Sequence, residues 1–314
     1  MGSRATYRLI SNVAFLLVAW PSSTFGQVAT AEPSAPIITY NAIHHPVVGR
    51  DGMVSSQNAV STRVGVEILE RGGNAIDAAV GVGLALAVTL PRAGNLGGGG
   101  FMVVHLADKD RTVAIDFREV APALAHSNMY FSEDGEVDNA EYRFTHKSSG
   151  VPGTIAGFDH ILREYGTMTW AEVIEPALRL ARDGIEVTDD LAMNLSGSKA
   201  RLTNNPATAA AFYKPNGSDY RSGETLRQPD LAWTLEQLQM GGADAFYRGS
   251  IAERIVADME AHNGIITAKD LADYRVVERE PVRGTYRGFD IAAMSAPSSG
   301  GMHIVQMLNI MENF

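Results

Sequence analysis

The stretch GNLGGGG, residues 94–100, stands directly before two strand-like segments and decides how this chain is interpreted. Residues 101–106 and 112–117 are predicted to form a hairpin, because a charged turn at residues 107–111 joins them. Adjacent glycines lose much conformational entropy on folding, so a packed domain keeps them mainly where the backbone needs a positive φ or a very close neighbour. We therefore expect a ligand or another strand to lie against this run.

Arg118 lies at the end of the second predicted strand, between Phe117 and Glu119, and so close to the expected position of the glycines. A planar guanidinium can bind a carboxylate through two parallel hydrogen bonds, which makes Arg118 a candidate for holding a substrate carboxylate. A structural ion pair with Asp116 or Glu119 explains the arginine equally well. The residues alone leave both interpretations open.

The composition excludes several classes of function. The chain has 314 residues, 45% of them hydrophobic, which is enough for one large domain or two ordinary ones. Its formal net charge of -10 argues against a nucleic-acid partner, because phosphate binding needs a basic face. The absence of cysteine excludes disulfides, thiolate metal sites and a cysteine nucleophile. Small or peptide-like substrates fit this composition better.

The N-terminal segment has the pattern of a secretory signal. Arg4 and Arg8 precede a short apolar core at residues 13–19, which is too short to span a bilayer, and the run Ala29-Thr30-Ala31 resembles a cleavage site. An uncleaved anchor or an ordinary N-terminus is the alternative. We expect residues 1–31 to be a signal peptide, residues 32–50 a linker and residues 51–314 the folded domain, in a secreted or periplasmic protein.

The pattern of the folded part indicates an α+β or layered α/β/α domain, with a helical block covering one face of a sheet. Residues 74–90 are almost continuously apolar and predict a helix buried on all sides. Residues 121–150 are polar and predict a long surface loop. Further helices are predicted at residues 61–71, 154–165, 170–182, 229–240 and 243–262, strand structure at 281–292, and a last helix after residues 298–301.

Other motifs give weaker signals. The glycine run lacks the Gly-Lys-Ser/Thr of a phosphate-binding loop and is not followed by a helix, so nucleotide binding is not expected. Ser196-Gly197-Ser198-Lys199 matches the S-x-x-K pattern of serine acylases, but its companion motifs are absent and chance explains it better. The eight histidines are scattered, so no metal site is expected. Ser298 and Ser299 are either a helix cap or part of a loop that lines a pocket.

Five motifs in order closely resemble the γ-glutamyltranspeptidase (glutathione hydrolase) family. They are Gly52-Met53-Val54, residues 72–79, residues 97–102, Asp116-Phe117-Arg118-Glu119 and residues 296–301. This resemblance implies an N-terminal-nucleophile hydrolase, an α+β fold with an αββα layered sandwich, of which this chain holds the large-subunit part only. It also implies cleavage of the γ-glutamyl amide of glutathione and transfer of the γ-glutamyl group to water, amino acids or peptides, without a cofactor. Arg118 is then the residue that grips the α-carboxylate of the γ-glutamyl group.

One departure from the family pattern concerns the nucleophile. In the family a threonine opens the small subunit in a Thr-Thr-His-type segment, and no such segment occurs in this sequence. We therefore expect a domain, residues 51–314, that is incomplete at its C-terminus, holds no catalytic residue and is inactive without the small subunit of the same precursor. The alternative is a secreted, non-catalytic protein that binds γ-glutamyl compounds or amino acids. A related amidase, such as a cephalosporin acylase, also stays open.

Overall fold

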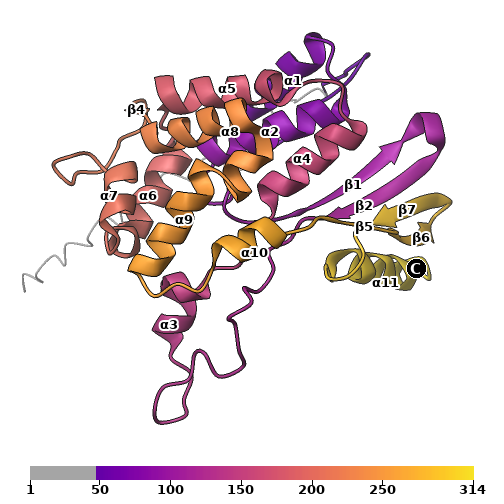
Figure 1. Ribbon diagram of the computed structural model, residues 1–314. Coiled ribbons are helices and arrows are strands. Elements are labelled where there is room, and N and C mark those ends of the chain that lie inside the picture. The colour runs from indigo at the N-terminus through magenta and orange to yellow at the C-terminus, as the bar shows by residue number, and fades with distance from the viewer. Residues whose placement is uncertain (1–46) are drawn as a thin grey trace, which may run out of the picture. The chain divides into compact units, whose positions relative to one another are not determined.

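The computed structural model describes residues 47–314. The expected signal peptide, residues 1–31, and the linker up to residue 46 lie outside this range. Residues Gly49–Phe314 make up one unit of mixed helices and antiparallel strands, so the α+β class is confirmed (Figure 1). Of the expected layered sandwich, these residues contain a helical block, a three-stranded sheet and a separate hairpin with its own helix.

The predicted hairpin is confirmed and joins a third strand from far along the chain. Strands β1 (Phe101–Leu106) and β2 (Arg111–Asp116) pair antiparallel, and β2 pairs with β5 (Val277–Arg279). Phe101 lies opposite Asp116, and Gly100 and Phe117 extend the ladder by exchanging backbone hydrogen bonds of 3.3 and 3.1 Å. Val104 is buried while its neighbour Val103 is exposed. Strand β1 therefore turns one face toward the helical core and the other toward solvent.

Helix α2 (Ala75–Thr89) is the buried central helix that the apolar pattern predicts. The side chain of Asn74 caps the first turn, and the carboxylate of Asp77 accepts a hydrogen bond from the backbone N–H of Asn74, so the helix begins at a complete capping box. Helices α1 (Ala59–Glu70) and α5 (Trp170–Asp183) pack against it. Within residues 47–314, no helix combines the length and the apolar character that crossing a membrane requires.

Some helices of the helical block lie where the sequence pattern predicts them, and others differ in their bounds or were not predicted. Helices α4 (Thr154–Tyr165) and α5 occupy the predicted ranges. The break expected before residue 243 is present as a kink in α8 (Pro229–Tyr247) at Gly242, where φ is 58°. The single helix predicted at 243–262 is wrong, because it is interrupted at Arg248 and Gly249 before α9 (Ser250–Ala261) begins. The sequence pattern misses three helices and two short strands of this block, and strand β5 beyond it. The missed elements of the block are α6 (Asp189–Leu202), α7 (Pro206–Phe212), α10 (Ala268–Asp273), β3 (Ile185–Glu186) and β4 (Thr225–Leu226).

Residues 121–150, called here the 121–150 excursion, are largely exposed but are not a plain loop. They contain helix α3 (Asn139–Phe144), which Asp138 caps, and a 3₁₀ turn at His146–Ser148. A bridge between Val120 and Val151 closes the base of the excursion. The prediction of a surface segment is therefore correct, but the prediction of a loop without helices is wrong. The short helix α3 escaped prediction because a single capped turn is too short to show a helical period.

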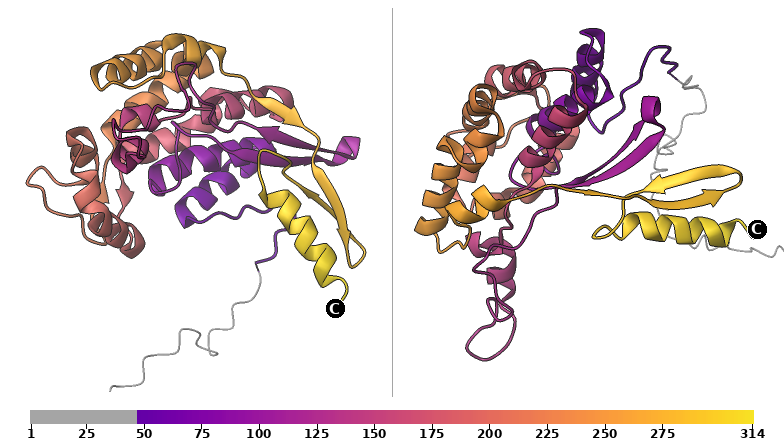
Figure 2. Two further views of the ribbon diagram at one scale, coloured as in Figure 1. Left: turned by 90° about the horizontal axis from the view of Figure 1, so that it is seen from below. Right: turned by 45° about the vertical axis from the view of Figure 1, so that its right-hand side comes forward.

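The last part of the described chain is a second hairpin with a helix on it. Strands β6 (Val282–Tyr286) and β7 (Phe289–Ala293) replace the single strand segment expected at 281–292, with a turn at Arg287 and Gly288, where φ is 50° and 84°. Figure 2 shows α11 (Gly300–Met311) running along this hairpin. Ser299 precedes α11 without a side-chain cap, but the Oγ atom of Ser298 accepts a hydrogen bond of 3.3 Å from the N–H of Gly300, so the cap interpretation is wrong for Ser299 and holds for Ser298.

Candidate functional site

The glycine run brings its backbone against the backbone around Arg118. A Cβ atom on Gly99 would lie 2.6 Å from the carbonyl oxygen of Phe117 and 2.8 Å from the Cα of Arg118. None of the glycines at 97–100 has a positive φ. Of the two reasons expected for the run, close approach is thus confirmed and positive φ is wrong, and the neighbour is the segment that carries Arg118.

The same run is tied to the start of helix α4. The carbonyl oxygen of Gly98 accepts hydrogen bonds from the backbone N–H groups of Gly153 and Thr154, at 2.7 and 3.0 Å. The hydroxyl of Thr154 donates to Asn95 Oδ1 at 3.0 Å, and the N–H of Gly98 donates to the same oxygen at 2.9 Å. N–H groups at a helix start often bind anions, but here a carbonyl of the run already uses them. The run therefore serves to fasten the start of α4.

The main chain of Arg118 is held from both sides. Its N–H donates to Asp116 Oδ1 at 3.1 Å, and its carbonyl oxygen accepts a hydrogen bond of 2.8 Å from the hydroxyl of Tyr274. Burial raises the pKa of Tyr274 well above its ordinary range, so the hydroxyl stays protonated and keeps donating. Two anchors therefore fix the point from which the Arg118 side chain leaves the backbone.

The carboxylate expected to compete for Arg118 is bound elsewhere. Asp116 Oδ2 accepts a hydrogen bond of 2.9 Å from Arg279 Nε on β5, and the Asp116 side chain is only 9% exposed. Within residues 47–314, Arg118 forms no ion pair with Asp116, Glu119 or any other acid. Its guanidinium carbon lies 6.0 Å from the ring centre of Phe101. The structural ion pair considered for Arg118 is thus not formed in the described part of the chain.

A cavity of about 360 Å³ lies at Arg118. It joins the segment after β2 to the segment that leads into β5, and it includes Pro297 from the sequence motif at residues 296–301. Two sequence motifs 179 positions apart, at Arg118 and at Pro297, are therefore parts of one cavity wall. Its lining residues are Asp116, Arg118, Glu119, Val120, Tyr274, Arg275, Val277, Arg279 and Pro297.

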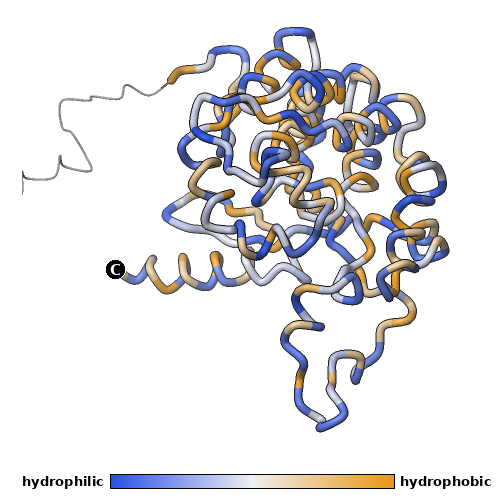
Figure 3. Tube along the Cα trace, turned by 90° about the vertical axis from the view of Figure 1, so that its left-hand side faces the viewer, coloured by the Kyte–Doolittle hydropathy of each residue, from blue (hydrophilic) through white to orange (hydrophobic). Residues whose placement is uncertain are grey.

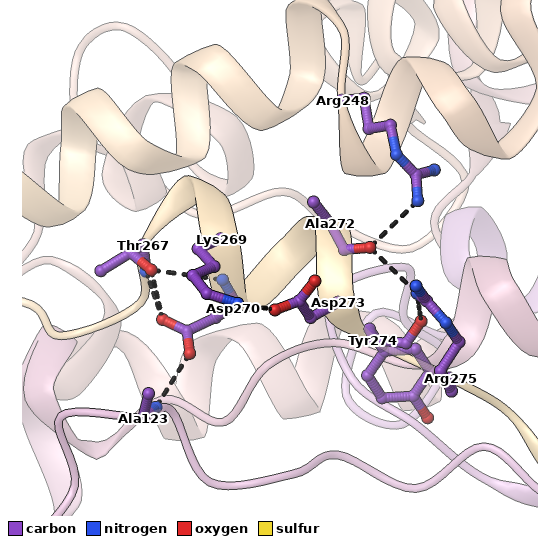
Figure 4. Close-up of polar contacts among 9 residues, drawn as sticks. All are labelled: Ala123, Arg248, Thr267, Lys269, Asp270, Ala272, Asp273, Tyr274 and Arg275. Atoms are coloured by element: carbon purple, nitrogen blue, oxygen red, sulfur yellow. Dashed lines mark hydrogen bonds and ion pairs between the residues drawn. The ribbon is translucent and has the colours of Figure 1, made fainter.

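The other arginines of the cavity already have partners, which the sequence did not reveal. Arg279 binds Asp116, as described above. Arg275 Nη1 donates to the carbonyl oxygens of Tyr274 and Ala272 at 2.6 and 2.9 Å, and Arg248 Nη2 donates to Ala272 at 3.0 Å (Figure 4). These contacts hold the end of α10 and the chain beyond it in place. Arg118 is the cavity arginine whose guanidinium has no carboxylate or carbonyl partner among residues 47–314.

The structure also shows what the other candidate motifs of the sequence do. The Ser196 to Lys199 motif lies on α6, where Lys199 Nζ donates to Asp219 Oδ1 at 2.6 Å and to the carbonyl oxygen of Gly217 at 2.7 Å. The hydrogen bond from Lys199 holds the pKa of Asp219 below its ordinary range. The contacts of this lysine are structural, which agrees with the interpretation that the match to the S-x-x-K pattern is due to chance. Two histidines that are far apart in the sequence, His146 and His262, stack on each other in the structure.

Comparisons with known proteins identify relatives of this chain. A family model described as Gamma-glutamyltranspeptidase matches residues 61–314. The chain is 48% identical over 289 residues to a glutathione hydrolase proenzyme of Escherichia coli K12, covering 91% of this chain and 50% of that protein. It is 36% identical over 288 residues to an acylase ACY 1 proenzyme of Pseudomonas sp. V22, covering 90% of this chain and 51% of that protein. It thus spans about half the length of the curated relatives it matches.

A solved structure extends the comparison to the fold. The crystal structure of Helicobacter pylori gamma-glutamyltranspeptidase matches with a TM-score of 0.84 and 44% identity, covering 86% of this chain and 77% of the chain in that structure. The expected fold of the N-terminal-nucleophile hydrolase type is confirmed by this match. From its sequence and its fold together, this chain belongs to the gamma-glutamyltranspeptidase family.

Proposed function

We propose that this chain is the large-subunit half of a γ-glutamyltransferase and glutathione hydrolase, in which Arg118 binds the α-carboxylate of the γ-glutamyl group. The observation that carries the proposal is the guanidinium of Arg118, which lies at a cavity of about 360 Å³ and has no ion pair within residues 47–314. A bidentate arginine and carboxylate pair supplies both binding energy and a fixed orientation.

The anchoring of Arg118 supports a positioning role. Because Tyr274 and Asp116 hold its main chain, less conformational freedom is lost when the guanidinium binds a carboxylate. A γ-glutamyl group fixed at this end presents its amide carbon at a defined distance, which is what nucleophilic attack requires. The small subunit of the same precursor would supply the threonine hydroxyl, its base and the oxyanion donors. The acyl group then passes from the threonine to water or to an acceptor amine.

Exposed apolar surface supports the presence of a second half. Helix α11 leaves a set of large apolar side chains between 45% and 56% exposed, and Figure 3 shows hydrophobic residues recurring along it. Groups of exposed large apolar side chains often mark interaction surfaces in soluble proteins. We assign this face to the contact with the small subunit. The side chains are Met302, Ile304, Met307, Ile310 and Met311.

The test is release of nitroaniline from γ-glutamyl p-nitroanilide by the chain alone and by the chain combined with the small subunit of a related glutathione hydrolase. We expect activity only in the combination. Arg118→Ala should lower kcat/KM about 100-fold, or roughly 2.7 kcal/mol, because a hydrogen-bonded charge pair is lost. Arg118→Lys should give an intermediate loss, since a lysine keeps the charge but not the fork.

Two controls separate binding from folding. Arg111→Ala removes an exposed arginine of the β1–β2 hairpin and should leave kcat/KM unchanged. Butyryl p-nitroanilide lacks the α-carboxylate, so its slow hydrolysis should be insensitive to Arg118→Ala. Equal losses for both anilides would show that Arg118 acts on the fold, and the proposed carboxylate contact would then be wrong.

The similarity to an acylase proenzyme favours a second candidate, an amidase that accepts an acyl group without an α-amino group. Glutaryl p-nitroanilide keeps the carboxylate that Arg118 would bind and lacks only that amino group. Faster turnover of the glutaryl substrate would favour the acylase. Faster turnover of the γ-glutamyl substrate favours the transferase and hydrolase.

Export is part of the proposal and rests on the N-terminal pattern of Arg4, Arg8 and the apolar residues 13–19. Cell fractionation of a tagged full chain tests it. We expect the mature protein in the periplasm or medium, shortened by about the length of the signal, and retention in the cytoplasm would contradict export.

A further inference from the structure

Two histidines from distant parts of the chain stack on each other. His146 belongs to the 3₁₀ turn of the 121–150 excursion, and His262 follows the last residue of α9. Their ring centres are 4.4 Å apart and their planes differ by 11°. Asp258, four positions before His262 on the same face of α9, places its Oδ2 atom 2.9 Å from His146 Nε2 and its Oδ1 atom 3.2 Å from His262 Nδ1.

These three side chains have the chemistry of a metal site and lie within reach of one ion, which the two nearly parallel rings can share once the side chain of His262 turns. One ligand atom of each residue lies within 4.8 Å of the ligand atoms of the other two. Imidazole nitrogens and a carboxylate oxygen are ligands that Zn²⁺ and related transition metals accept. In a tetrahedral zinc site with bonds of ~2.0–2.1 Å, neighbouring ligand atoms are ~3.3 Å apart. The contact between His146 and Asp258 is already close to that separation.

The surroundings orient the second histidine. The backbone carbonyl oxygen of Asp258 lies 2.9 Å from His262 Nδ1, so this nitrogen can donate its proton there and leave the lone pair on Nε2. Metal-binding histidines commonly use a backbone carbonyl in this way. The side chains of His146, Asp258 and His262 are 24%, 59% and 53% exposed, so an ion from solvent can reach them and water can complete its coordination.

The site would join two segments that few other contacts connect. The bridge between Val120 and Val151 and a hydrogen bond from the N–H of Ala123 to Asp270 hold the base of the excursion. Figure 1 shows the excursion leaving the helical block beside α9 and α10. We propose that His146, Asp258 and His262 bind one divalent transition-metal ion, with Zn²⁺ as the probe, and that this ion fastens the 121–150 excursion to α9.

The first experiment is calorimetric titration of ZnCl₂ into the untagged full chain after treatment with a chelator. We expect one Zn²⁺ ion per chain, and no comparable binding of Mg²⁺, because Mg²⁺ prefers oxygen ligands. His146→Asn and His262→Asn should each weaken Zn²⁺ binding at least tenfold. His126→Asn is the matched control, since His126 is an exposed histidine of the same excursion outside the cluster, and it should bind Zn²⁺ as the unmodified chain does.

The second experiment measures the fastening itself. Limited proteolysis should cut within residues 121–150, and Zn²⁺ should slow this cleavage severalfold in the unmodified chain but not in His146→Asn. Asp258→Asn keeps the shape of the side chain and should weaken the protection as well. An absence of saturable Zn²⁺ binding, equal affinity in the histidine variants, or cleavage that Zn²⁺ does not slow would each overturn the proposal.

Discussion

Arg279 donates a hydrogen bond of 2.9 Å from its Nε atom to Asp116 Oδ2, and this contact engages one of the two acids that lie within two positions of Arg118 in sequence. Strand β5 lies beside β2 with Ala114 opposite Arg279, so the pair with Asp116 is a diagonal one across the two strands. The side chain that prepares the candidate site therefore comes from a strand 163 positions further along the chain.

Removing Arg279 should cost stability. In Arg279→Ala the nearly buried carboxylate of Asp116 keeps only the backbone N–H of Arg118 as a partner. We expect a loss of about 1–3 kcal/mol, measured by urea unfolding of the full chain. Arg111→Ala is the matched control, because its contact with Glu278 is 3.8 Å long and its side chain is 55% exposed, so its loss should stay below about 0.5 kcal/mol. Equal losses in the two variants would contradict the special role of the Asp116 pair.

The glycine run should tolerate alanine at one position and not at another. A Cβ on Gly99 would lie 2.6 to 2.8 Å from backbone atoms of Phe117, Glu119 and Arg118, which cannot turn away. We expect Gly99→Ala to cost about 1–3 kcal/mol and to lower the activity of the combined subunits with it. Gly97 has no atom within 4 Å of its Cβ position and no positive φ, so Gly97→Ala should leave the unfolding midpoint almost unchanged. If the two variants behave alike, close packing does not explain the run.

Asp77 is the buried polar group with the most hydrogen bonds in the helical core described here. It is fully buried and accepts hydrogen bonds from the backbone N–H groups of Asn74, Thr167 and Met168 and from the hydroxyl of Thr167. Because both carboxylate oxygens accept, an asparagine would turn its NH₂ group toward a donor in either orientation. Asp77→Asn should cost about 2–4 kcal/mol in a thermal or urea melt. Glu172→Gln, at the exposed capping box of α5, should shift the same melt much less than Asp77→Asn does.

The elements that could be predicted from sequence are those whose signals are local. The apolar run before Pro91, the turn between β1 and β2, and the helices α4 and α5 each have a period or a punctuating residue within a few positions. The Arg118 motif was recognisable as well, through its resemblance to a family. These signals decided the α+β class without any knowledge of long-range contacts.

The parts that escaped prediction depend on residues that meet only in the folded chain. Nothing near Asp116 in sequence indicates Arg279, and nothing near Arg118 indicates Tyr274, which lies 156 positions away. The cluster of His146 and His262 with Asp258 is of the same kind. The short helix α10 has a single capped turn, which is too little for a periodic pattern.

Glu278 on β5 should make stability depend on pH in the acid range. The hydroxyl of Tyr165 donates to its Oε1 at 2.7 Å and lowers the pKa of this carboxyl below its ordinary value of 4.5, with His160 contributing at 3.0 Å. In the unfolded chain Glu278 binds its proton more readily, so its stabilising contribution is complete above about pH 4.5 and is lost as the pH falls through the lower folded value. Thermal melts of Glu278→Gln should therefore show a Tm below that of the unmodified chain at pH 6 and a gap that narrows toward pH 3. Glu236→Gln, an exposed glutamate on α8, should show no such narrowing, and a constant gap for Glu278→Gln would mean that its contacts do not discriminate between the two protonation states.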